Sequence, residues 1–223
     1  MTQGVPTLQE PAEAFVGGWP ARYAVAQRHL ARRDPVLRSI IQLVGHCTLR
    51  PDAANPFALL VRSIISQQIS TRAAEAIRAR LERVLGAITP QALAAVSDDV
   101  LRAAGLSRPK LKALRDLTEK VQIGVVPLDH LHQWSDDDVI ASLLPVRGIG
   151  RWTAQMFLIF GLGRLDVLPV DDYGLRCGVQ KHYGLGRLPS KGELLDLAEP
   201  WRPYCTVATW YIWRSLGTVP QST

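Results

Sequence analysis

Apolar residues recur at helical spacing along almost the whole chain, and alternating strand patterns are scarce. Apolar positions three and four residues apart are typical of amphipathic helices that bury one face. Together with capping residues, they predict helices over 20–29, 35–44, 57–66, 70–85, 109–123, 153–160 and 204–216, and further helices beginning near 89, 97, 135, 171 and 190. The sequence therefore predicts an all-α fold.

Two of the expected helices flank a short connection that contains two glycines. Ser135 and the acidic residues after it begin the first helix, and the second continues to Phe160. Between them, Gly148 and Gly150 flank Ile149. Their backbone N–H groups can approach a phosphate without a Cβ in the way and with a helix N-terminus behind them. The pattern indicates an anion site, although a lone G-x-G also occurs in ordinary helix–helix turns.

Composition agrees with a nucleic-acid partner. The 223 residues carry 26 Lys and Arg against 20 Asp and Glu, a net charge of +6, which suits a phosphate-binding surface but also fits a merely basic soluble protein. A hydrophobic content of 47% is enough for one domain or two small interleaved ones. No apolar run approaches the ~20 residues that cross a bilayer, and residues 1–13 lack the features of a signal peptide. We therefore expect an intracellular protein without a membrane partner.

The cysteines predict no metal cage or disulfide framework. Cys47, Cys177 and Cys205 are an odd number and widely separated, with no zinc-type spacing. Three thiolates are also too few for an iron–sulfur cluster. We expect them to be small core residues.

Four ordered motifs suggest a family. They are FALLVRSIISQQIS at 57–70, the hairpin RGIGRWTA at 147–154, PVDDY at 169–173, and WRPY at 201–204 with YIW at 211–213. Together they resemble the AlkA-type 3-methyladenine DNA glycosylases of the helix-hairpin-helix superfamily of base-excision repair enzymes. The resemblance covers about residues 35–216.

The resemblance implies two helical subdomains with the active site in the cleft between them. We expect a middle bundle over 55–168 that carries a wedge loop and the hairpin, and a second bundle from 1–54 plus 169–223. Longer bacterial members have a β-rich domain before the helical core. Too few residues precede 57 for that domain, so no N-terminal β domain is expected.

The resemblance also implies a single catalytic carboxylate, and Asp172 matches it. Breaking an N-glycosidic bond builds positive charge on the sugar, which a carboxylate stabilises while it orients or deprotonates a water. Asp171 is then expected to cap the next helix, and capping is the simpler role for either aspartate. Members that also cut the strand carry a lysine where Trp152 stands, and an indole cannot form an imine. We expect a monofunctional glycosylase that leaves an abasic site.

The same resemblance identifies a base pocket. Trp152 and Trp213 match the family's aromatic pocket positions, and Met156 stands where some members carry Tyr. Alkylation at N3 of adenine or N7 of guanine leaves a purine cation that stacks on aromatic faces. The expected substrates are therefore alkylated purines, of the 3-methyladenine and 7-methylguanine type, in double-stranded DNA. Core packing is the alternative for each Trp.

Residues for holding the DNA follow in the same way. Gln68 matches the intercalating wedge, which fills the space left by a flipped base; the alternative is an amide in a solvated turn. The N–H groups of Gly148 and Gly150 would hold the backbone beside the lesion, with Arg147 and Arg151 as phosphate partners.

In the family, hairpin carbonyls also coordinate a monovalent cation, Na+ or K+. By position these belong to Leu144, Val146 and Ile149. The ion is structural, so no cofactor is expected for the reaction, and the protein is expected to act as a monomer. Two alternatives remain: a uracil or mismatch DNA glycosylase, which would use the same hairpin with another pocket, and a non-catalytic DNA-binding module, which would need no carboxylate.

Overall fold

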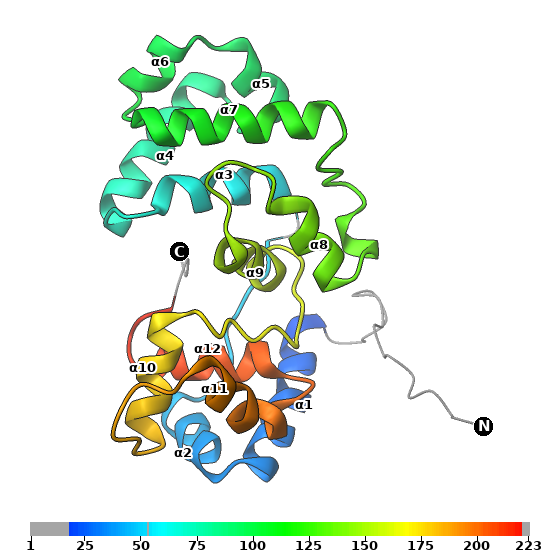
Figure 1. Cartoon of the computed structure of the whole chain (residues 1–223), viewed down its shortest axis with the longest axis vertical. Coiled ribbons are helices and arrows are strands. Elements are labelled where there is room, and N and C mark those ends of the chain that lie inside the picture. Colours follow the sequence, from blue (N-terminus) through cyan, green and yellow to red (C-terminus); the bar gives the residue numbers. More distant parts are fainter. Residues whose placement is uncertain (1–17, 53, 220–223) are drawn as a thin grey trace, which may run out of the picture. The chain divides into compact units, whose positions relative to one another are not determined.

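The computed structural model describes residues 18–52 and 54–219, and every regular element within those ranges is a helix (Figure 1). This confirms the all-α fold. The chain forms two compact units. Unit 2 runs from Arg50 to Asp172, and unit 1 combines the described residues up to Leu49 with those from Tyr173 onward.

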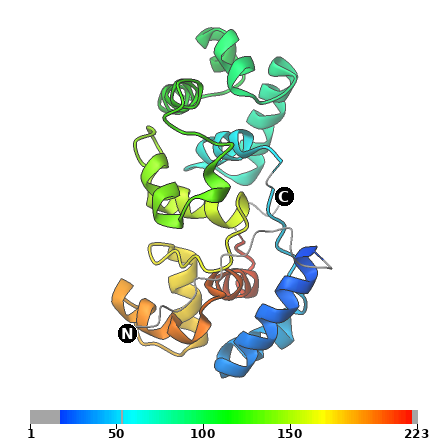
Figure 2. The ribbon, with the colours of Figure 1, turned by 90° about the vertical axis from the view of Figure 1, so that its right-hand side faces the viewer.

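Unit 2 is built around two strongly buried helices. Its helices are α3 (Pro56–Ser66), α4 (Thr71–Leu85), α5 (Pro90–Ala95), α6 (Asp98–Ala103), α7 (Arg108–Gln122), the 3-10 helix η2 (Leu131–Gln133), α8 (Asp136–Leu143) and α9 (Arg151–Phe160). In α9 every residue from Thr153 onward is buried, as expected of a core helix that is apolar on all sides. Helix α3 contacts α4, α7 and α9. Figure 2 views α7 nearly end-on, in green, with α3 and the connection between α8 and α9 beneath it.

Helix starts in both units follow the capping residues of the sequence. The Asp34 carboxylate accepts hydrogen bonds from the first turn of α2, with Pro35 at the first helical position. Ser135 caps α8 by accepting from the Asp138 N–H at 3.2 Å. These caps satisfy backbone donors that have no partner inside the helix.

Unit 1 is centred on its last helix. Its helices are α1 (Gly18–Arg33), α2 (Pro35–Val44), α10 (Tyr173–His182), α11 (Lys191–Ala198), the 3-10 helix η3 (Glu199–Trp201) and α12 (Cys205–Ser215). Helix α12, orange-red in Figure 1, contacts α1, α2 and α10. A Cβ on Gly178 of α10 would lie 2.2 Å from Ile212 Cγ2, so glycine permits the close approach of α10 to α12.

Two further observations concern the cysteines and the membrane. Cys47 and Cys205 are buried, as expected of small core residues, and Cys177 is partly exposed. Burial raises the pKa of the Cys47 thiol to about 12, so this thiol is unreactive at neutral pH. Within 18–52 and 54–219, none of the helices has the length and apolarity that crossing a bilayer requires.

Candidate active site and DNA-binding hairpin

The hairpin connects the end of α8 to the start of α9, and its two glycines have different roles. Gly148 has φ +80°, in the left-handed region, and a Cβ there would lie 3.3 Å from Ala113 Cβ of α7. Gly150 has φ −97° and is the N-cap of α9. The left-handed backbone at position 148 therefore requires glycine. At position 150 the backbone does not require it, but glycine leaves the N-terminus of α9 without a side chain over it.

The start of α9 presents backbone donors. No side chain caps this helix within the described part of the chain. The N–H groups of its first turn, from Arg151 to Thr153, therefore lack partners inside the helix and suit an anion. Gly148, Gly150, Arg147 and Arg151 are all exposed, as a phosphate-binding surface requires. Their DNA-binding roles stay predictions.

Two side chains that the sequence analysis did not single out hold the hairpin. Asp116 of α7 accepts from the Arg147 N–H at 2.7 Å, and Gln67 Nε2 donates to the Gly148 carbonyl at 2.8 Å. Burial raises the pKa of Asp116, but hydrogen bonds from Lys120 and from the Arg147 N–H outweigh it and keep this pKa below its ordinary value. Asp116 is therefore an ionised acceptor at neutral pH.

The candidate catalytic residue, Asp172, is joined to the hairpin helix. Its side chain is buried, and Oδ2 accepts a 2.8 Å hydrogen bond from Trp152 Nε1, twenty residues earlier. The Asp172 N–H donates to the Pro169 carbonyl at 2.8 Å, which closes a turn just before α10. The structure thus brings together the hairpin helix and the carboxylate, the pair of motifs on which the sequence argument depends.

One expectation about this segment is wrong. Asp171 was expected to cap the next helix, but α10 begins at Tyr173, so Asp172 directly precedes it and Asp171 is an exposed residue of the turn. Both aspartates are good capping residues, and sequence spacing alone does not distinguish them.

The three residues predicted to line the base pocket lie in different units. Trp152 and Met156 lie one turn apart on α9 in unit 2, and Trp213 lies on α12 in unit 1. Trp152 is half-buried, whereas Met156 and Trp213 are buried. Burial is also what the core-packing alternative expects, so the pocket roles stay predictions.

The predicted wedge residue has an unusual backbone. Gln68 is exposed and has φ +58°, and it is the one non-glycine residue with positive φ among those described. A left-handed conformation costs a non-glycine residue roughly 1–2 kcal/mol, so the surrounding structure must hold it. A projecting side chain in a fixed turn is suited to a wedge, and that role stays a prediction.

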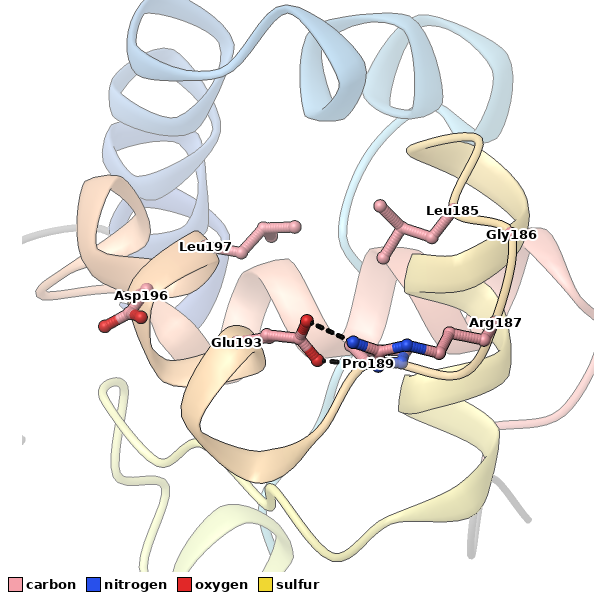
Figure 3. Close-up of a pocket in the computed structure, with 7 residues that line it drawn as sticks. All are labelled: Leu185, Gly186, Arg187, Pro189, Glu193, Asp196 and Leu197. Carbon is pink, nitrogen blue, oxygen red and sulfur yellow. Dashed lines mark hydrogen bonds and ion pairs between the residues drawn. The ribbon is translucent and has the colours of Figure 1, made fainter.

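Asp172 lines neither of two surface hollows. One, of about 420 Å³, lies in unit 1 and is drawn in Figure 3, where Leu185 and Leu197 face each other above the Arg187–Glu193 ion pair. The other, of about 580 Å³, lies in unit 2 beside Trp134 and Asp138. Neither contains a predicted site residue.

The helical fold and the glycine hairpin are those of a helix-hairpin-helix protein, and comparison with known proteins identifies the family. The family model described as "HhH-GPD superfamily base excision DNA repair protein" matches residues 61–203. The chain therefore belongs to the HhH-GPD superfamily.

Several relatives are similar over most of their length. DNA-3-methyladenine glycosylase 1 of Schizosaccharomyces pombe is 32% identical over 198 residues, which cover 85% of this chain and 86% of the relative. The structure of the S. pombe 3-methyladenine DNA glycosylase Mag1 with abasic DNA matches with a TM-score of 0.75 at 31% identity, over 89% of this chain and all of that one. A DNA-3-methyladenine glycosidase structure from Bacillus halodurans matches with a TM-score of 0.78 at 39% identity, over 86% of this chain and 89% of that one.

Proposed function

We propose that this protein is a monofunctional DNA glycosylase that removes alkylated purines from duplex DNA and leaves an abasic site for base-excision repair. Relatives named DNA-3-methyladenine glycosylase, at 30% identity or more over most of the chain, support the substrate class. The observation that carries the reaction is the buried Asp172 carboxylate, hydrogen-bonded to the indole of the hairpin helix.

The chemistry follows from that carboxylate. As the glycosidic bond lengthens, positive charge develops on the sugar, and a carboxylate held beside it lowers the barrier and orients the attacking water. The Trp152 N–H donates to Asp172 Oδ2 and fixes the rotamer of this carboxylate. An alkylated purine leaves as a neutral base, so little acid assistance is needed.

The hairpin holds the strand. N–H groups at the exposed Gly148 and at the start of α9 bind the phosphate beside the lesion, and Arg147 and Arg151 add charge. Backbone contacts carry no sequence information, which suits an enzyme that must act on lesions in any sequence.

Trp152 stands at the position where strand-cutting members carry the lysine nucleophile. We therefore expect no covalent intermediate with the sugar. Incubation with methylated DNA and borohydride tests this point, since a trapped protein–DNA adduct would show that the protein also cuts the strand.

The substrate is tested with DNA treated with dimethyl sulfate. We expect wild-type protein to release 3-methyladenine and 7-methylguanine as free bases. If it released neither, duplexes with uracil or mismatched bases would be the next substrates. DNA binding without release of any base would identify a non-catalytic module.

We also propose that the hairpin carbonyls hold a monovalent cation. Leu144, Val146 and Ile149 place three carbonyl groups within one short turn, and those of Leu144 and Ile149 accept no hydrogen bond from the described residues. Uncharged oxygen ligands suit Na+ or K+, which would stabilise the turn without taking part in the chemistry. Replacing K+ by tetramethylammonium at equal ionic strength should weaken DNA binding. We further propose that the protein acts as a monomer, which sedimentation with and without DNA would test.

A further inference from the structure

Side-chain hydrogen bonds join three parts of unit 2 to one another. These parts are the wedge loop (residues 66–70), the hairpin (144–150) and helix α7. The wedge loop would displace the base, and the hairpin would hold the phosphate. Neither function by itself requires a bond between them.

Helix α7 holds both loops. Lys110 Nζ donates to the Ile65 carbonyl at 2.6 Å, at the end of α3 where the wedge loop begins. Desolvation lowers the pKa of Lys110, because its half-buried ammonium gives up water to bind a carbonyl that has no helical partner. Two turns further along α7, Asp116 accepts from the hairpin's Arg147 N–H.

Gln67 joins the two loops directly. Its amide donates to the Gly148 carbonyl at 2.8 Å, across 81 positions of sequence. The same peptide is held on its other side, because the Ile149 N–H donates to the Val146 carbonyl at 3.0 Å. The peptide plane of the hairpin at Gly148 is therefore fixed by a residue of the wedge loop.

The bond also bears on the next residue. Gln68 is strained at φ +58°, and its chain neighbour Gln67 is the nearest residue tied to a fixed point outside the loop. Without the Gln67 bond, the loop can relax toward an unstrained turn, and the Gln68 side chain loses its fixed direction.

On the basis of the proposed function, we infer that Gln67 is a positioning residue that couples the wedge loop to the phosphate-binding hairpin. The two loops then move as one rigid body, so that base displacement and backbone binding occur together. Gln67 itself does no chemistry. Its effect reaches the reaction through Gln68 and depends on how much energy is needed to expel the base.

Gln67→Met tests this inference, because methionine has nearly the same length but cannot donate. Loss of one neutral hydrogen bond should slow excision of a lesion paired with a normal base roughly five- to tenfold. The loss should disappear for a lesion opposite an abasic analogue, where there is no partner base for the wedge to engage. It should also disappear in a Gln68→Ala background, because Gln67 acts through Gln68.

Two controls separate positioning from folding and from the proposed function. Gln91→Met, at an exposed position of α5, should leave the excision rate unchanged on both duplexes. The Tm of Gln67→Met should stay near that of the wild type. The rise in fluorescence of 2-aminopurine beside a tetrahydrofuran abasic site measures wedge insertion without any excision, so it reports on Gln67 even if the protein released no base. Equal losses on both duplexes, additive losses with Gln68→Ala, or an unchanged rate of fluorescence rise would overturn the inference.

Discussion

Each of the two units contains a buried aspartate that accepts a hydrogen bond from a tryptophan indole. In unit 1, Asp34 is 5% exposed and accepts from Trp201 Nε1 at 2.9 Å. In unit 2, Asp172 is 6% exposed and accepts from Trp152 Nε1 at 2.8 Å. Burial and an indole partner therefore do not distinguish a structural carboxylate from the proposed catalytic one.

Their surroundings differ. Asp34 Oδ1 accepts from the N–H groups of Val36 and Leu37, and Oδ2 accepts from the Tyr183 hydroxyl as well as from Trp201. A carboxylate can accept about four hydrogen bonds, and all four of these come from residues of unit 1. Asp172 instead lies in the segment after α9 and is bonded to the helix that follows the expected DNA-binding hairpin. Asp34 therefore stabilises unit 1, whereas the proposed role of Asp172 is catalysis.

Asp172→Asn should have the largest effect on activity. The amide keeps the shape but loses the negative charge, so excision from methylated DNA should fall about 10²- to 10⁴-fold while DNA binding persists. Single-turnover release of free base, with binding measured by fluorescence anisotropy, checks both. The matched control is Asp171→Asn at the exposed neighbour, which should excise at nearly the wild-type rate; equal losses in the two variants would contradict the assignment.

Asp34→Ala should have the largest effect on stability. It removes the α2 cap and leaves the Tyr183 hydroxyl and the Trp201 N–H buried without their acceptor, at a cost of about 3 kcal/mol in the free energy of unfolding. Urea unfolding measures this cost. Excision per folded molecule should be unchanged, and a specific loss of catalysis in the stable fraction would remove the contrast with Asp172.

The two indole donors provide an intermediate test. Trp152→Phe keeps an aromatic ring but removes the hydrogen bond to Asp172, so excision should fall about tenfold with a small change in Tm. Trp201→Phe removes the equivalent bond to Asp34 and should reduce stability by about 1–3 kcal/mol while leaving excision intact. A loss of excision in Trp201→Phe, with only a loss of stability in Trp152→Phe, would contradict the roles given to the two aspartates.

Glu193 is a carboxylate that also accepts several hydrogen bonds but is exposed, so its substitution should have the smallest effect on stability. Hydrogen bonds from Arg187, and next from the Ser190 N–H, lower its pKa from the ordinary 4.5 to about 2. Its stabilising contribution is therefore complete above pH 4.5 and is lost as the pH falls toward 2. Because the group is exposed, Glu193→Gln should lower the Tm only slightly at pH 7, and the difference should vanish near pH 2. A difference that grew in acid would refute this sign.

Much of this arrangement could be predicted from local sequence. Capping by Asp34 with Pro35 after it, and by Ser135, depends on neighbouring residues and is visible in the sequence. Gly148 was expected only to let a phosphate approach the backbone, and its left-handed φ is a finding of the structure. The start of α10 was misplaced because two adjacent aspartates are equally good caps.

The long-range bonds could not be predicted in this way. Gln67 to Gly148 and Tyr183 to Asp34 join residues 81 and 149 positions apart, and such pairs are formed by the packing of helices rather than by local pattern. The Trp152–Asp172 bond was also missed, because Trp152 was interpreted as a wall of the base pocket and as the replacement of a lysine, and not as a hydrogen-bond donor. The doubled glutamine at 67–68 was a visible signal, but only its second residue was given a role.

The most direct measurement is a crystal structure of the wild-type protein bound to duplex DNA that carries a pyrrolidine abasic analogue, whose charged nitrogen stands in for the sugar cation. We expect the Asp172 carboxylate at about 3 Å from that nitrogen, with the amides of the hairpin on the adjoining phosphate. A nitrogen bound out of reach of Asp172, or a hairpin that makes no contact with the strand, would contradict the proposed mechanism.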